Sequence, residues 1–253
     1  MKQRIVIKIG SSTLTSGTTR ISYAKIEDLA RQILTLRTSY DIVIVSSGAI
    51  AAARQYVDLS GRTNYADSKQ AMAAIGQPKL MKLYDDIFGS FGLHVAQCLL
   101  TYRDFEDVTA RENTRNTIEK LLEHTYIPII NENDTVAIEE ILLGDNDKLS
   151  ALVAGIIEAD ILIIASDIDG LYDDNPHLNP QATLITEVKN LDDIRRFAHE
   201  KNSSLGTGGM TTKIHAAEIC LKNNVEMWIV NGGDNNFVVN ALDGKIRFTR
   251  FKL

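Results

Sequence analysis

The sequence has 253 residues, of which 44% are apolar and 24% are charged, and only four are prolines. This composition excludes a disordered or fibrous protein, and the length is compatible with a single α/β domain over residues 1–253. A formal net charge of −6 argues against nucleic acid as the main partner, because phosphate-backbone binding requires clustered Lys and Arg. No apolar run approaches the roughly 20 residues of a membrane span, so we expect no membrane partner and a cytoplasmic protein.

Short β-branched runs alternate with segments of helical periodicity along the chain. Strands are predicted at residues 5–9, 42–45, 94–99, 127–130, 161–165 and 226–230. Helices are predicted after a Ser22 cap and at residues 80–91, 113–124 and 148–158. This alternation predicts an α/β protein whose mainly parallel sheet has helices on both faces and binds ligands at the carboxyl ends of its strands.

Lys8 lies within the first predicted strand and is followed closely by Gly10. A buried ammonium group is costly without an anionic partner, although a lone lysine at a strand end more often extends into water. Gly10 shifts this balance, because a glycine turn lets backbone N–H groups approach phosphate oxygens. The combination therefore favours a phosphate site.

A glycine-rich segment, GTGGMTTK at residues 206–213, forms a second candidate site. It precedes a helix whose N-terminus would present unpaired N–H groups and the positive end of the dipole to an anion. Lys213 is predicted in the first turn of this helix, where a polyphosphate would compensate its unfavourable position. The plain alternative is a flexible surface loop with an exposed lysine. Neither candidate segment matches the P-loop or the dinucleotide fingerprint.

Three further segments are rich in polar groups: NEND at residues 131–134, GDND at 144–147 and SSGAI at 46–50. The first two lack the alternating ligands and the bidentate Glu of a calcium loop. Asp145 or Asn146 would by itself be explained as a cap of the next helix, a role that is compatible with function. The hydroxyl and amide groups of the third segment could receive a carboxylate. This segment lacks the glycine pair that flanks a hydrolase nucleophile, which argues against serine hydrolysis.

Taken together and in order, these segments resemble the amino acid kinase family, and within it the members that phosphorylate glutamate. The matching segments are KIGSS at 8–12, SSGA at 46–49, NEND at 131–134, DND at 145–147, DIDGLY at 167–172 and GTGGMTTK at 206–213; the stretch from KQA at 69–71 to GQ at 76–77 adds to them. The resemblance implies a three-layer αβα sandwich whose N-terminal half binds glutamate and whose C-terminal half binds ATP.

The resemblance also implies roles for the matching residues. Lys8 and Lys213 would hold the transferring phosphoryl group, and Asp147 would keep both ammonium groups in position. Gly10 and Ser11 would add backbone donors to the same group. Because a carboxylate acceptor is already ionised at neutral pH, the reaction needs no catalytic histidine.

The implied ligand sets are larger. Glutamate would be bound by Ser47, Gly48, Asn131, Asp134, Asp145 and Asn146, with Asp134 meeting its α-ammonium group. The nucleotide would be bound by Lys8, Ser166, Asp167, Thr207, Gly208, Gly209, Met210, Thr211, Thr212 and Lys213. ATP and Mg²⁺ would be the cofactors, and no protein ligand set for a metal is expected.

Further properties follow from the resemblance alone. Many of the enzymes that this sequence resembles carry a C-terminal domain of the PUA type, which we expect to be missing because the sequence ends at Leu253. Feedback inhibition by proline, a homo-oligomeric state and a glutamyl phosphate reductase as partner are also implied. The alternatives are a related kinase acting on acetylglutamate, aspartate, carbamate or UMP, or a non-catalytic sensor of glutamate or proline.

Overall fold

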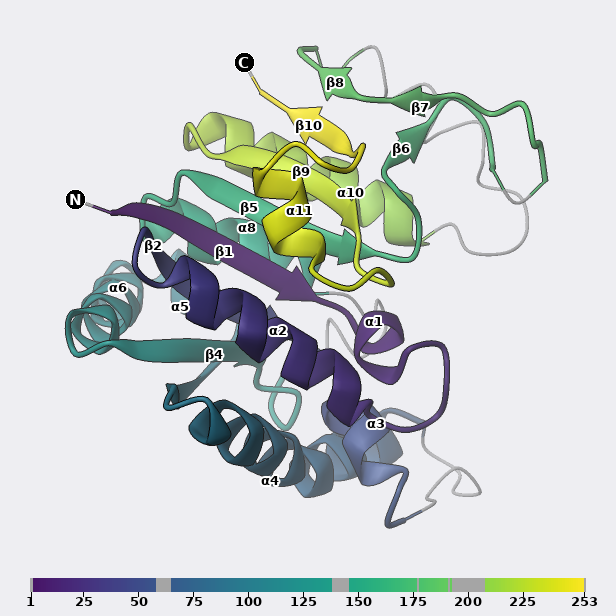
Figure 1. The fold of residues 1–253 in the computed structure, drawn as a ribbon. Coiled ribbons are helices and arrows are strands. Elements are labelled where there is room, and N and C mark those ends of the chain that lie inside the picture. Colours follow the sequence, from purple (N-terminus) through teal and green to yellow (C-terminus); the bar gives the residue numbers. More distant parts are fainter. Residues whose placement is uncertain are drawn as a thin grey trace.

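The fold is built on a mainly parallel sheet, seen in the computed structural model in Figure 1, which describes residues 2–57, 65–137, 146–176, 178–190, 192 and 208–252. Within these residues the sheet has eight strands in the order β3-β4-β2-β1-β5-β9-β10-β8. The six predicted strands are confirmed as β1 (Gln3–Ile9), β2 (Tyr40–Ser46), β3 (His94–Leu100), β4 (Tyr126–Glu132), β5 (Ile161–Ser166) and β9 (Glu226–Asn231). The sheet is completed by β10 (Thr249–Phe251), antiparallel to β9, and by β8 (Glu187–Val188).

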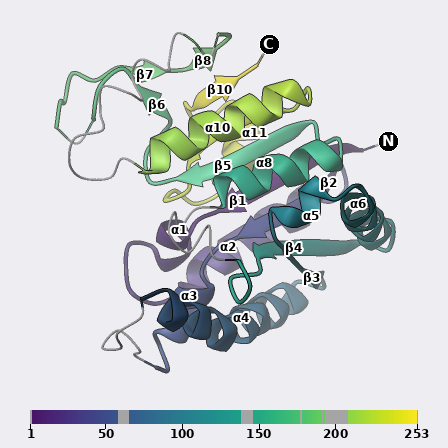
Figure 2. The ribbon, with the colours of Figure 1, turned by 180° about the vertical axis from the view of Figure 1, so that it is seen from behind.

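Helices cover both faces of the sheet, as predicted. Figure 1 shows α2 (Tyr23–Leu36), α4 (Tyr65–Ser90) and α11 (Phe237–Leu242) in front of it. The view from behind in Figure 2 shows α5 (Arg103–Glu106), α6 (Val108–Glu123), α8 (Asp147–Ile156) and α10 (Gly208–Lys222) on the other face. The short helices α1 (Ser11–Thr15) and α3 (Ala49–Ala53) follow β1 and β2 directly. The structure is therefore the three-layer αβα sandwich that the sequence predicts.

The alternation of side chains along β1 divides the core into two layers. Ile5, Ile7 and Ile9 are at most 1% exposed and pack against α2 and α4. Val6 points to the opposite layer, which α8 and α10 cover. Because successive side chains of a strand point to opposite faces, Lys8 lies on the same face as Val6. The strand thereby aims an ammonium group toward α8 and α10.

The order of the strands places β1 between β2 and β5, both parallel to it. Strands β2 and β4 extend the sheet on one side, while β5 and β9 extend it on the other. Ligands of open α/β sheets bind where the strand order diverges in this way, outside the carboxyl ends of the strands. In Figure 1 the arrowheads of β1 and β5 point to the edge where α1 lies.

Several element boundaries differ from the predictions. Helix α4 begins at Tyr65 instead of residue 80 and continues through Pro78, while α6 begins at Val108 after an Asp107 cap. Strands β6 (Leu171–Tyr172) and β7 (Leu184–Ile185) pair as an antiparallel hairpin, which the sequence analysis did not predict. None of the helices in the described part of the chain combines the length and the apolar character of a membrane span.

Candidate active site

Three charged side chains meet at the carboxyl edge of the sheet. Asp147 Oδ1 lies 2.7 Å from the Lys8 ammonium nitrogen in an ion pair, and Asp147 Oδ2 accepts a hydrogen bond from the Lys213 ammonium group at 3.1 Å. Asp147 is 0% exposed, Lys8 is 4% exposed and Lys213 is 9% exposed. Two buried cations therefore share one buried carboxylate, so these three side chains together carry a net positive formal charge that is only slightly exposed to water.

The cluster joins three elements that are distant in sequence. Lys8 comes from β1, Asp147 from the first turn of α8, and Lys213 from α10. The N-terminal turn is a favourable place for a carboxylate, because the helix dipole is positive there. The Thr212 hydroxyl donates to Asp147 Oδ2, the oxygen that also accepts from Lys213, at 3.0 Å. The predicted grouping of Lys8, Asp147 and Lys213 thus corresponds to a direct contact in the structure.

Gly10 lies beside the Lys8 ammonium group. A Cβ atom at Gly10 would lie 3.4 Å from the Lys8 Nζ atom, at van der Waals contact. Gly10 is also the N-cap of α1, whose first residue is Ser11. The first N–H groups of a helix have no partner within the helix, so this turn offers backbone donors next to an ammonium group. The geometry is suited to an anion.

The start of α10 corrects one prediction. The helix begins at Gly208, so Gly208 and Gly209 form its first residues and Lys213, its sixth, lies in the second turn instead of the first. Lys213 is therefore further from the unfavourable end of the dipole than expected, and its ion pair with Asp147 explains its burial. Met210 and Thr211 follow in the first turn, whereas Thr207 lies outside the described residues.

Ser47 and Gly48 connect β2 to α3. The Ser47 N–H group donates to the carbonyl of Ile9 at 2.9 Å, which holds this turn against the end of β1. Gly48 has a φ of 108°, which favours glycine, and an added Cβ would lie 3.0 Å from Leu14 Cδ1. The turn therefore requires glycine at this position. It places Ser47 at the carboxyl edge of the sheet, where the ion cluster also lies.

Asn146 is buried and directs its side chain into a polar network. Its Nδ2 group donates to Ser47 Oγ at 3.0 Å and to Asn131 Oδ1 at 2.9 Å. It is the N-cap residue of α8, but its side chain makes no capping hydrogen bond. A capping role for this side chain is therefore wrong, and three of the predicted glutamate ligands are instead bonded to one another.

Asp134 lies on the turn after β4 and is partly buried. Burial raises the pKa of its carboxyl group from an ordinary value of 3.8 to about 6, against the opposing effect of the Lys69 ammonium group on α4. A carboxylate that is poorly solvated gains much from a cationic partner, and the α-ammonium group of an amino acid would supply one. Asp145, the other predicted acidic ligand, lies outside the described residues.

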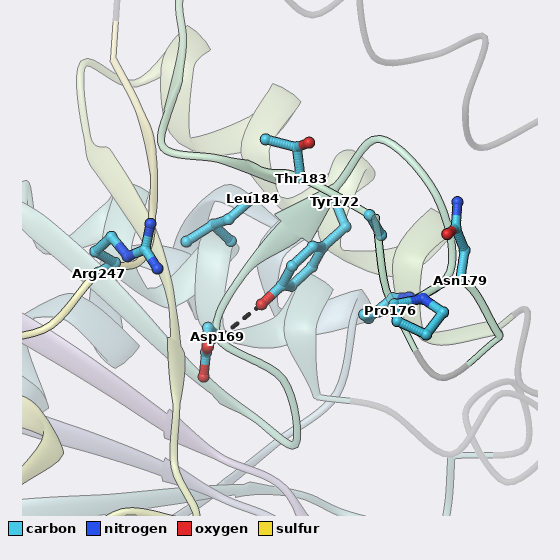
Figure 3. Close-up of a pocket in the computed structure, with 9 residues that line it drawn as sticks. Asp169, Tyr172, Pro176, Asn179, Thr183, Leu184 and Arg247 are labelled. Atoms are coloured by element: carbon cyan, nitrogen blue, oxygen red, sulfur yellow. Dashed lines mark hydrogen bonds between the residues drawn. The ribbon is translucent and has the colours of Figure 1, made fainter.

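Ser166 and Asp167 end β5 at the same edge, and the Ser166 hydroxyl donates to Asp167 Oδ1 at 3.2 Å. Just beyond them lies a cavity of about 410 Å³. Figure 3 shows Asp169, Tyr172 and Arg247 pointing toward one another in it, with the Tyr172 hydroxyl 3.3 Å from Asp169 Oδ2. None of the predicted site residues that the structure describes lines this cavity, so the ion cluster and the cavity are separate features of one edge.

The sequence analysis did not assign a role to two residues that lie at this site. Lys69 influences Asp134, and Gln77 bonds to Asn131. Both fall in the stretch between residues 69 and 77 that carried part of the resemblance, which was the available signal. Within the described residues, no group of three or more His, Cys, Asp or Glu side chains is arranged to hold a metal ion.

Comparisons with protein families and known sequences identify relatives of this chain. Residues 3–231 match the amino acid kinase family. The chain is 46% identical to a glutamate 5-kinase of Dehalococcoides mccartyi strain CBDB1, over 98% of this chain and 68% of that protein. It is 45% identical to a glutamate 5-kinase of Clostridium acetobutylicum, over 98% of this chain and 94% of that protein.

Two solved structures share the fold at low sequence identity. A UMP kinase from Ureaplasma parvum has a TM-score of 0.70 at 20% identity and covers 100% of both chains. An isopentenyl phosphate kinase has a TM-score of 0.67 at 18% identity, covering 99% of this chain and 100% of its own. These two structures agree with the fold described above. The family match over residues 3–231 and the identities of 46% and 45% to the two sequence relatives show that the chain belongs to the amino acid kinase family.

Proposed function

We propose that this chain transfers the γ-phosphoryl group of ATP to the γ-carboxylate of L-glutamate, forming L-glutamyl 5-phosphate in the first step of proline biosynthesis. The observation that carries the proposal is the buried Lys8–Asp147–Lys213 cluster, which lies beside a network of amide and hydroxyl side chains suited to an amino acid. The identities of 46% and 45% to two glutamate 5-kinases support glutamate as the acceptor.

The chemistry requires charge neutralisation more than proton transfer. The acceptor carboxylate is ionised at neutral pH and attacks a polyanion, so the barrier contains a large electrostatic repulsion. Lys8 and Lys213 contribute two ammonium groups to the site. Asp147 holds both in position, and its single negative charge does not neutralise their two positive charges. Preorganised cations of this kind stabilise the charge that spreads over the phosphoryl oxygens in the transition state.

The residues present fit a nucleoside triphosphate. The Lys8–Asp147–Lys213 cluster is buried and carries a net positive formal charge, and Gly10 lies directly beside the Lys8 ammonium group. The transferring group would be held by Lys8 and Lys213, with backbone donors from Gly10 and Ser11. The nucleotide would also be held by Ser166, Asp167 and the segment 207–213. Mg²⁺ bound to the phosphates would neutralise further charge.

On the acceptor side, we propose Ser47, Gly48, Asn131, Asp134, Asp145 and Asn146 as the residues that bind glutamate. Asp134 would pair with the α-ammonium group, an interaction that N-acetylglutamate lacks. The donor groups of the Ser47 to Gly48 turn would face a carboxylate of the substrate. We propose that one domain over residues 1–253 holds both ligand sets: the acceptor ligands lie between residues 47 and 146, and the nucleotide ligands other than Lys8, Gly10 and Ser11 lie between residues 166 and 213.

We also propose a cytoplasmic location, a homo-oligomeric assembly, inhibition by proline and transfer of the labile product to a glutamyl phosphate reductase. Each extends the resemblance to glutamate-phosphorylating members of the family. Size measurement by light scattering tests the assembly, and proline titration of the activity tests the inhibition.

The acceptor specificity is tested by measuring ADP release with glutamate, N-acetylglutamate, aspartate and UMP under identical conditions. We expect glutamate to give the highest kcat/KM, and Asp134→Asn to reduce kcat/KM for glutamate while KM for ATP stays within about twofold. Preference for another acceptor would refute glutamate as the substrate. Binding of glutamate or proline without ADP release would identify a sensor instead.

A further inference from the structure

Helix α4 directs the side chain of Gln77 toward the proposed acceptor ligand Asn131. Gln77 is 8% exposed and accepts a hydrogen bond on Oε1 from Asn131 Nδ2 at 2.8 Å. Its own Nε2 group donates to Gln97 Oε1 on β3 at 3.0 Å. Burying an amide in this way is favourable only if its donor and acceptor groups find partners, so Gln77 is held in one orientation.

The direction of this hydrogen-bond chain is determined by the backbone. The Glu132 N–H group, which can only donate, lies 2.9 Å from Asn131 Oδ1 and identifies that atom as the oxygen. Asn131 must then present Nδ2 to Gln77, so the facing atom of Gln77 must be its carbonyl oxygen. Gln77 and the Glu132 N–H group therefore select the same orientation of the Asn131 amide from its two ends.

Asn131 passes this orientation on to Asn146. The Asn131 oxygen accepts from Asn146 Nδ2 at 2.9 Å, and the same nitrogen faces Ser47 Oγ at 3.0 Å and the Ser46 carbonyl at 3.4 Å. Three acceptors surround the nitrogen end of Asn146, so its carbonyl oxygen is turned away from them. An oriented carbonyl oxygen of this kind is suited to an ammonium group of the substrate.

We propose that Gln77 is a positioning residue for glutamate: it holds Asn131, and through Asn131 it orients Asn146 and Ser47 for the acceptor. Gln77 belongs to the α4 stretch that shares sequence with the family and has no role in the phosphoryl-transfer cluster. This inference rests on the proposed function, because it concerns how the same site recognises its acceptor.

The test is the steady-state kinetics of Gln77→Met, which retains volume and removes the carbonyl that Asn131 uses. We expect KM for glutamate to rise about tenfold, as the loss of a buried hydrogen bond allows, with kcat changed less than about threefold and KM for ATP unchanged. If Gln77→Met does not fold, Gln77→Asn has the same expected result, since its shorter side chain withdraws the carbonyl from Asn131.

A double-mutant cycle shows whether Gln77 acts through Asn131. Asn131→Ala alone should raise KM for glutamate, and Gln77→Met in that background should add less than about twofold, because coupled residues are not additive. Phe88→Leu, a fully buried core change on the same helix, controls for general loosening of α4 and should lower stability without raising KM for glutamate.

The outcomes separate the two proposals. If wild-type enzyme turns over glutamate and Gln77→Met leaves KM for glutamate within about twofold, or if Phe88→Leu raises it equally, Gln77 is not a positioning residue. If Gln77→Met and Asn131→Ala multiply their effects in full, the route through Asn131 is wrong. If wild-type enzyme does not phosphorylate glutamate at all, the proposed function fails, and this inference fails with it.

Discussion

The Asp147 carboxylate has a buried ammonium group on each of its two oxygens, at 2.7 Å and 3.1 Å. At the residue scale, this one carboxylate compensates the charge of both buried lysines. A buried charge is tolerated only when it is paired, and each lysine depends on the same partner. Asp147 therefore serves stability and positioning together, and both should respond when its charge is removed.

Asp147→Asn retains the shape of the side chain and removes the charge that compensates Lys8 and Lys213. We expect it to reduce the free energy of unfolding by about 3–5 kcal/mol, because removing one partner leaves buried charges unpaired. We also expect kcat to fall by about 100-fold or more, since the lysines lose their fixed positions. Chemical denaturation and steady-state kinetics measure these two quantities.

The matched control is Asp41→Asn. Asp41 pairs with Lys2 at 3.9 Å, and the two side chains are 31% and 45% exposed. An exposed pair contributes about 0–1 kcal/mol, so its loss should change stability little and leave kcat unaltered. Equal effects of the two substitutions would show that burial of the Asp147 cluster does not matter.

Asp134 gives the acceptor site a pH dependence. Its pKa is raised by burial to about 6, so the carboxylate that would pair with the α-ammonium group is lost as the pH falls through this value. At pH 5 roughly one-tenth of these groups are ionised, and KM for glutamate should be roughly tenfold higher than at pH 8. The glutamate γ-carboxylate has an ordinary pKa of about 4.3 and remains mostly ionised there.

The sign of the stability effect is opposite to that of the binding effect. The pKa of Asp134 is higher in the folded chain than its ordinary value of 3.8, so protonation favours the folded state. The stability cost of this group is present above pH 6 and disappears as the pH falls toward 4. Asp134→Asn should remove both dependences, and a KM for glutamate that still rises equally at low pH in this variant would exclude Asp134 as the cause.

At the scale of elements, the contact between α3 and α4 determines the geometry of the acceptor site. A Cβ atom at Gly76 would lie 1.7 Å from the Ala49 carbonyl oxygen and 2.8 Å from the Ala53 nitrogen. Both are backbone atoms and have no rotamer to change. The two helices are therefore as close as glycine permits, and the next residue after Gly76 is Gln77.

Gly76→Ala should force α4 away from α3. We expect a loss of at least about 1–3 kcal/mol in the free energy of unfolding, as overpacking against backbone produces, and a higher KM for glutamate because Gln77 moves with the helix. Gly89→Ala on the same helix is the control: nothing lies within 4 Å of the added Cβ, and alanine should stabilise the helix by about 0.5–1 kcal/mol. Destabilisation by both substitutions would mean that the contact with α3 is not the cause.

Strong local patterns were sufficient to predict the central elements. The β-branched runs gave six strands within two residues of their ends, and Ser22 caps α2 by accepting from the Lys25 N–H group at 3.3 Å. The N-terminal part of α4 was missed because its small, polar residues show little helical periodicity before residue 80. The two-residue strands β6, β7 and β8 were missed because strands this short have no period of their own.

At the scale of the whole molecule, the topology brings distant loops to one edge. A parallel sheet with helical connections places the carboxyl ends of β1, β2, β4 and β5 side by side, so polar segments after these strands could be expected to meet. This is why Lys8, Ser47, Asn131 and Ser166 could be selected from the sequence as candidates without coordinates.

The connections within the site could not be predicted in the same way. The hydrogen bonds that Asn131 donates to Gln77 and that Asn146 donates to Ser47 join residues more than fifty positions apart, and no local pattern encodes them. The exact start of α10 was also inaccessible, because consecutive glycines at residues 208–209 fit both a loop and a helix.

The most direct test of the proposed function is the ATP-dependent formation of γ-glutamyl hydroxamate from glutamate and hydroxylamine, because hydroxylamine traps an acyl phosphate. We predict that wild-type protein forms the hydroxamate and that Lys8→Ala and Lys213→Ala each reduce its rate by about 100-fold or more. A folded wild-type protein that forms no hydroxamate, or lysine variants that retain the wild-type rate, would contradict phosphoryl transfer to glutamate at this site.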